Sequence, residues 1–106
     1  MVTDYIVVLV TAKNRAEAEK ISQTLLEEKL VACINIIDSV VSFFHWQGKI
    51  DRANEYLIIM KTHKRLFAKL VERVKALHSY DVPEVLALPV LDGSSDYLSW
   101  VNDSLK

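Results

Sequence analysis

Apolar residues follow two different patterns along the first third of the chain, one typical of a buried strand and one typical of an amphipathic helix. The segment YIVVLVT, within residues 4–11, is rich in β-branched residues and apolar on both faces, which predicts a strand in the middle of a sheet. In the next segment, residues 14–29, Asn14 is a candidate N-cap and apolar side chains recur at helical spacing. This spacing predicts an amphipathic helix, whose buried stripe contains Ala18, Ile21 and Leu25.

The middle of the chain predicts one long hairpin. From Leu30 to Trp46 the chain has no glycine or proline and is enriched in valine, isoleucine and phenylalanine, as strands are. After Gln47 and Gly48 the chain resumes over residues 49–62, whose second half is again strand-like, so the two runs are expected to form a hairpin. Within the first run, Asp38 and Ser39 predict a bulge or bend.

The last third predicts a helix, a strand and a short helix. Residues 62–77 carry leucine and valine at helical spacing, with Thr62 as candidate N-cap. The segment VLALPVL, residues 85–91, predicts a strand, and Pro89 restricts it to an edge position because proline donates no ladder bond. Residues 93–105 predict a short helix with a serine cap.

The predicted fold is therefore α+β. The order β-α-β-β-α-β plus a C-terminal helix is that of the ferredoxin-like split βαβ arrangement, as one domain over residues 1–106. A composition of 51% hydrophobic residues with only two glycines and two prolines favours such a regular, packed domain over disorder.

Charge and cysteine content indicate which classes of partner and which cellular compartment to expect. The net charge of -1 provides no general attraction to nucleic acid or an anionic membrane. Although residues 64–75 carry five basic residues, residues 49–61 contain only one aromatic residue, Tyr56, so an RNA-recognition surface is not predicted.

The apolar run Tyr5 to Val10 is too short to span a membrane or to act as a signal peptide. Because Cys33 is the only cysteine, a reducing, cytoplasmic location is expected.

The hairpin predicts self-association. Two strands of more than ten residues outrun the helices of a chain this short, which leaves apolar side chains and strand edges without a partner. A second copy of the chain is the simplest partner, and a closed ring would prevent growth into fibres.

Several segments together resemble the CutA family of divalent-cation tolerance proteins. They are LVACINI, SFFHWQGKI, EYLIIMKT, HSYDVPEVLALPV and DYLSW, and they cover nearly the whole chain. The resemblance implies a homotrimer of ferredoxin-like subunits, a role in heavy-metal tolerance, and binding of copper or another divalent cation. It implies no established catalytic reaction.

Some positions depart from the family pattern. Ser79 stands where proline is usual, and Phe44 where tyrosine is commoner. Val10 and Leu77 stand where some bacterial relatives have a cysteine and a second histidine.

Two residues are candidate metal ligands. The thiolate of Cys33 would suit copper, although its place inside a strand is equally that of a small buried hydrophobe. His78 ends the second predicted helix, where a helix-capping role explains it as well as a metal does. His45 and His63 have no metal-ligand spacing and are expected to be solvated.

A second set of residues is a candidate ligand-binding cleft between subunits, with structural packing as the alternative. A hairpin end, a strand end and a helix-to-strand joint can meet there, bringing together Trp46, Lys61, Tyr80 and Glu84. Asp81 and Glu84 flank Pro83, and their side chains need not converge. No nucleophile elbow, Cys-His pattern or glycine-rich phosphate loop occurs, so no enzyme activity is predicted.

Two functions follow as hypotheses. The first is a trimeric divalent-cation tolerance protein that binds copper, another divalent cation or a small ligand between its subunits. The second is a trimeric signalling or interaction scaffold that binds a partner protein without metal chemistry.

Overall fold

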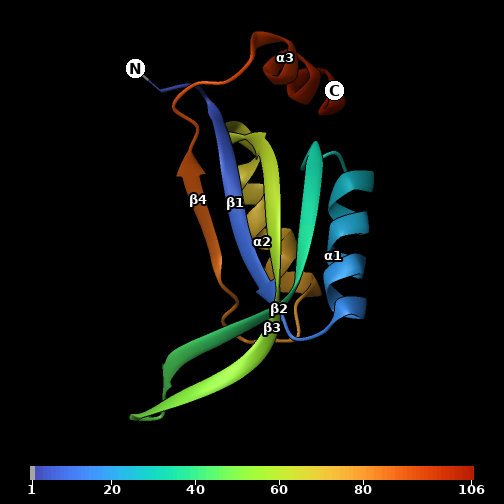
Figure 1. Cartoon of the computed structure of the whole chain (residues 1–106). Helices are drawn as coiled ribbons and strands as arrows, with labels where there is room; N and C mark the ends of the chain where they lie inside the picture. Colours follow the sequence, from blue (N-terminus) through green and yellow to red (C-terminus); the bar gives the residue numbers. More distant parts are fainter. Residues whose placement is uncertain (1) are drawn as a thin grey trace.

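The computed structural model describes residues 2–106 as one antiparallel sheet with three helices (Figure 1). The strand order is β2-β3-β1-β4. The strands are β1 (Tyr5–Ala12), β2 (Cys33–Trp46), β3 (Lys49–His63) and β4 (Val85–Pro89), and the helices are α1 (Arg15–Glu27), α2 (Phe67–Leu77) and α3 (Ser95–Ser104). The α+β class and the element order agree with the prediction from sequence.

The core lies between one face of the sheet and helices α1 and α2. Alternate residues of the central strand β1 point to this face and are buried, because successive side chains of a strand point to opposite faces. Each element contributes a short apolar stripe: Ile6, Val8 and Val10 from β1, Ile58 and Met60 from β3, Ala18, Ile21 and Leu25 from α1, and Leu70 and Val74 from α2. The predicted central strand and both predicted helix stripes are confirmed.

The other face of the sheet is covered at one end only. There α3 packs Val101 and Leu105 against Ala32, with Tyr5 and Leu66 beside them. Strand β4 forms an outer edge and ends at Pro89, opposite Ile6, so the predicted edge position of this proline is confirmed. The other outer strand is β2.

The N-cap predicted at Thr62 is wrong. Thr62 lies inside β3 opposite Ile6, is fully buried, and donates its hydroxyl to the carbonyl of Leu30 at 2.7 Å. The strand continues one residue further because a buried β-branched side chain is favourable in a sheet. His63 then takes the capping role, since its Nδ1 accepts the N–H of Arg65 at 3.1 Å.

Beyond the sheet, β2 and β3 continue as a projecting hairpin, here called the arm (residues 40–54; Figure 1). Pairing between β1 and β3 stops at Tyr56, so the arm's two strands pair only with each other. The register shifts between Ile37 and Val40, where Ser39 has a φ of 60°, which confirms the predicted bulge. Gln47 and Gly48 both have positive φ, as a tight two-residue hairpin turn requires.

The arm makes the protomer long and leaves apolar side chains exposed. The molecule measures 44 × 29 × 23 Å, and its radius of gyration of 14.4 Å exceeds the roughly 13 Å expected for a compact chain of this length. Exposed apolar residues of the arm are Val41, Phe43, Phe44, Trp46 and Ile50.

The end of α1 offers a test of local stability. Lys29 has a φ of 58° and follows the C-cap Glu28, and its N–H and that of Leu30 bond back to the carbonyls of Leu26 and Leu25. This is a Schellman motif, in which glycine avoids the Cβ strain of the left-handed conformation. We expect Lys29→Gly to raise the free energy of unfolding by about 0.5–1 kcal/mol.

Chemical denaturation at fixed protein concentration measures this change. Lys29→Ala is the control, because alanine keeps the Cβ and should leave the stability close to that of the parent. A less stable Lys29→Gly protein would contradict the assignment.

Candidate functional site

A cavity of about 780 Å³, here called the arm pocket, opens between the arm and the joint that connects α2 to β4. The arm contributes aromatic rings and Asp51, β3 contributes Glu55, and the joint contributes Tyr80, Val82 and Glu84. Among residues 2–106, no lysine or arginine lines the pocket. The aromatic rings of the arm are those of Phe43, Phe44, His45 and Trp46, and Ser42 and Thr11 complete the lining.

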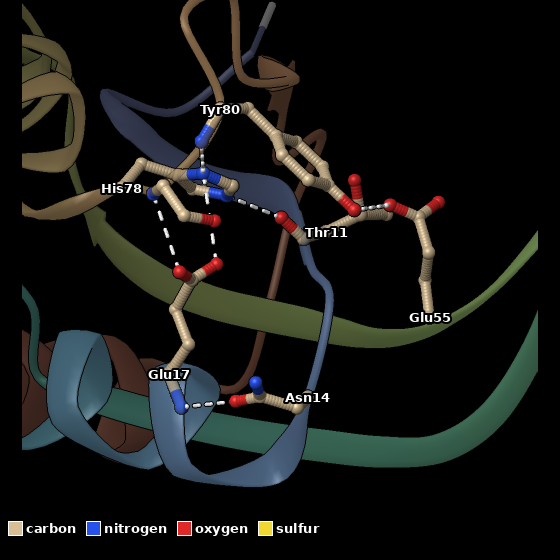
Figure 2. Close-up of polar contacts among 7 residues, drawn as sticks. Thr11, Asn14, Glu17, Glu55, His78 and Tyr80 are labelled. Carbon is tan, nitrogen blue, oxygen red and sulfur yellow. Dashed lines mark hydrogen bonds and ion pairs between the residues drawn. The ribbon is translucent and has the colours of Figure 1, made fainter.

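Glu55 is the most buried acidic side chain of the pocket, with 7% of the residue exposed. The hydroxyl of Tyr80 donates a hydrogen bond to its Oε2 at 2.9 Å (Figure 2). Burial of Tyr80, and next its hydrogen bond to Glu55, raises the pKa of Tyr80 from 10.0 to about 12. Tyr80 therefore remains a proton donor at neutral pH and holds one oxygen of Glu55.

Glu84 and Asp51 are the other carboxylates that line the same pocket. Desolvation, and next the charge of Glu55, raises the pKa of Glu84. Since its lining supplies no lysine or arginine to offset these charges, the pocket has acidic character. A positive ligand would relieve the repulsion between the carboxylates of Glu55 and Glu84.

Tyr80 is itself held by His78, whose side chain is fully buried. The N–H of Tyr80 donates to Nδ1 of His78 at 3.0 Å, and Nε2 of His78 lies 2.7 Å from the carbonyl oxygen of Thr11 (Figure 2). The two rings also pack together, with centroids 4.7 Å apart. His78 thus joins the end of α2 to the end of β1.

Glu17 of α1 approaches the same joint. It follows the N-cap Asn14, which accepts the N–H of Glu17 at 2.8 Å, as predicted for this helix start. Its Oε2 accepts the N–H of Ser79 at 3.2 Å. Its Oε1 is buried 3.7 Å from Nδ1 of His78 and has no hydrogen-bond partner within residues 2–106.

Three of the four predicted cleft residues lie together, and the fourth does not. Trp46, Tyr80 and Glu84 all line the arm pocket. Lys61 lies further along β3, opposite Val7 and Cys33, where its ammonium group contacts Asn35. Within one protomer Lys61 is therefore separate from the other three, and the grouping of all four between subunits stays a prediction.

The two predicted metal ligands are separate from each other. Cys33 pairs with Lys61 of β3, with 3.9 Å between Sγ and Nζ, and Lys61 in turn pairs with Val7 of β1. His78 instead contacts Thr11, four residues further along β1. Four residues along β1 correspond to roughly 13 Å. Within residues 2–106 no group of three or more His, Cys, Asp or Glu side chains could hold a metal ion. One protomer does not bring His78 and Cys33 into a common site.

The sequence interpretation missed Glu55, Glu17 and Thr11. Glu55 did carry a signal, since it is an acidic residue next to the apolar run YLIIM in a strand. A charge at such a position needs a partner, which here is Tyr80. Thr11 takes part through its backbone carbonyl, which no side-chain pattern reveals.

The helices of the structure can be compared with the length and hydrophobicity that a membrane span requires. None of the helices in the part of the chain described, residues 2–106, is long and apolar enough to cross a bilayer.

Comparison with known proteins gives consistent matches. Residues 6–104 match the family model described as CutA1 divalent ion tolerance protein. The divalent-cation tolerance protein CutA of Thermus thermophilus is 44% identical over 98 residues, which cover 92% of this chain and 95% of the relative. The chloroplastic protein CutA of Arabidopsis thaliana is 45% identical over 101 residues, covering 95% of this chain but 56% of the relative, so this chain spans just over half its length.

A solved structure agrees with the fold. The crystal structure of CutA1 from Oryza sativa has a TM-score of 0.95 and 41% identity, covering 99% of this chain and 96% of the other. At this identity the similarity extends to the family as well as to the fold.

The hydrogen bond from Tyr80 to Glu55 predicts a pH-dependent loss of stability. Tyr80→Phe removes the donor from a largely buried carboxylate, so we expect the free energy of unfolding at neutral pH to fall by about 1–2 kcal/mol. Because the pKa of Tyr80 is raised in the folded protein, the stabilisation is complete below pH 10 and is lost toward pH 12. The difference between parent and variant should therefore narrow across that interval.

Urea unfolding across this pH range measures the difference. Tyr56→Phe is a control, because it removes a tyrosine hydroxyl from the same strand as Glu55 and leaves the hydrogen bond from Tyr80 in place. A gap between parent and Tyr80→Phe that stays constant up to pH 12 would contradict the assigned hydrogen bond.

Proposed function

The chain belongs to the CutA1 family of divalent ion tolerance proteins, and on this premise we propose that it binds a divalent cation at Glu55 and Glu84 of the arm pocket. The observation that carries the proposal is the proximity of the two carboxylates, which contributes to the raised pKa of Glu84. A bound cation would remove this unfavourable interaction, and the relatives carry divalent-cation tolerance in their names.

The ligand atoms favour a hard cation. Carboxylate oxygens suit magnesium, calcium and manganese, whereas copper prefers imidazole and thiolate ligands. Two carboxylates fill only part of a coordination sphere, so water or a group from a second copy completes it. Copper binding through His78 and Cys33 would need His78 to give up a contact, because both of its ring nitrogens are engaged within the protomer.

We propose a homotrimer in which the arm pocket becomes a cleft between subunits. The two outer strands, β2 and β4, are different strands with open edges, and pairing β2 of one copy with β4 of the next is a heterologous contact that can close into a ring. The exposed apolar residues of the arm support the same arrangement. In such a ring Lys61 of a neighbouring subunit could join Trp46, Tyr80 and Glu84, as the sequence suggested.

The proposal describes a binding protein of the cytoplasm without catalytic activity and without a nucleic-acid or membrane partner. The alternative is a trimeric scaffold that binds a partner protein without metal. The exposed stacked pair Tyr97 and Trp100 on α3, with ring centroids 5.7 Å apart, favours this alternative as a contact for a partner. A partner protein that is captured equally with and without metal would favour the scaffold.

Titration with Mn(II) tests the cation site, because manganese favours oxygen ligands and avoids competition from the thiol of Cys33. We expect Glu55→Gln and Glu84→Gln each to weaken Mn(II) binding by roughly tenfold or more, since each removes a charged ligand. Isothermal titration calorimetry measures the affinity.

Asp81→Asn is the matched control, since Asp81 is an exposed carboxylate of the same joint that does not line the pocket. Its affinity for Mn(II) should equal that of the parent. Equal affinities for the parent and both glutamine variants would show that Glu55 and Glu84 do not bind the cation.

Light scattering at micromolar concentration tests the assembly. We expect a mass three times the 12.1 kDa of one chain, and Val41→Glu should dissociate it because a charge on the arm would be buried at the interface. Leu26→Glu, at a position of similar exposure on α1, should leave the trimer intact. A parent that has the mass of one chain would end the trimer proposal.

A further inference from the structure

We propose that His78 is a positioning residue of the arm pocket, which orients Tyr80 and through it Glu55, and that it does not bind the ligand itself. The inference rests on the proposed function for its effect on binding. Its structural part, the control of Tyr80 by His78, stands on the geometry of the protomer.

The two ring nitrogens of His78 have opposite roles. Nδ1 accepts the N–H of Tyr80 at 3.0 Å, so it carries no proton in this arrangement. Nε2 lies 2.7 Å from the carbonyl oxygen of Thr11, which can only accept, so Nε2 is the donor. The surroundings thus select one neutral tautomer, and both nitrogens are satisfied with the side chain fully buried.

These contacts connect His78 to the pocket. Because Nδ1 holds the backbone of Tyr80 and the imidazole packs against its ring, His78 restricts both the position and the direction of that side chain (Figure 2). The hydroxyl of Tyr80 then reaches Oε2 of Glu55 at 2.9 Å. The second oxygen of Glu55 has no hydrogen bond within residues 2–106, and Glu55 lines the pocket, so this oxygen is available to a ligand.

Glu17 holds the backbone of the joint through one of its two carboxylate oxygens. Its Oε2 accepts the N–H of Ser79, the residue between His78 and Tyr80, so helix α1 fixes the backbone of the joint. Its Oε1 lies 3.7 Å from Nδ1 without a hydrogen-bond partner in residues 2–106. This distance is longer than a hydrogen bond, so the Tyr80 N–H is the group within hydrogen-bond distance of Nδ1.

Two substitutions separate the roles of the ring nitrogens. The side-chain amide of asparagine places an acceptor near the position of Nδ1, and that of glutamine places a donor near the position of Nε2. His78→Asn therefore retains an acceptor for the N–H of Tyr80 and loses the donor to Thr11. His78→Gln retains the donor to Thr11 and loses the acceptor for Tyr80.

Two readouts are needed, measured on the full chain. The first is the ¹³Cζ NMR resonance of Tyr80, assigned with Tyr80→Phe, which reports the hydrogen bond of its hydroxyl. The second is the affinity for Mn(II). We expect His78→Asn to keep the parent resonance and an affinity within about twofold, and His78→Gln to shift the resonance and weaken Mn(II) binding by roughly tenfold.

The other outcomes overturn the proposal. A ligand role for His78 would weaken Mn(II) binding in both variants while the Tyr80 resonance stays unchanged. A purely structural role would reduce the stability of both variants without separating them in either readout. If the parent itself fails to bind Mn(II), the proposed cation site fails, and the Tyr80 resonance alone still tests the positioning role.

A measurement on the unaltered protein covers the case in which both variants fail to fold. ¹⁵N NMR of the His78 ring should show a protonated Nε2 and an unprotonated Nδ1, with coupling across the hydrogen bond from the N–H of Tyr80. A proton on Nδ1 at neutral pH would overturn the proposal.

Discussion

The structure depends on one strand, β3, which serves two different neighbours along its length. Its second half lies between β1 and β2 in the sheet, and its first half pairs with β2 alone. Strand β1 stops at Ala12 because Asn14 begins helix α1 two residues later. Glu55 is the first residue of β3 beyond the end of that pairing, so the cavity beside it exists because β3 continues where β1 cannot.

The same geometry explains how the joint between α2 and β4 is used. The joint crosses the end of β1, where carbonyl groups have no further strand to bond, and His78 supplies the donor for one of them. Tyr80 then lies over the place where the arm departs. An arrangement that completes the end of a strand thereby also provides a wall of the pocket.

Much of the fold could be predicted from local patterns, because each reflects a physical requirement of its own segment. The apolar run of β1, the buried stripe of α1 and the edge position of Pro89 in β4 were all predicted in this way. Thr62 was misassigned because a capping pattern and a buried strand residue use the same side chain, and only the pairing with Ile6 distinguishes them. The contact of Lys61 with Asn35 could not be predicted, because sequence does not show which neighbour a side chain contacts across a sheet. Backbone carbonyls such as that of Thr11 leave no pattern in the sequence at all.

The exposed arm has a consequence for the handling of the protein. The segment VVSFF, residues 40–44, has high β-propensity, no charge and no proline, and its strand lies at the edge of the sheet. Such a segment is a template for amyloid-like stacking whenever it is uncovered. On the proposed trimer, dilution or a mutation that separates the subunits is expected to lead to precipitation before the helical core melts. The shelf life of a preparation would then depend on that assembly more than on the stability of the individual fold.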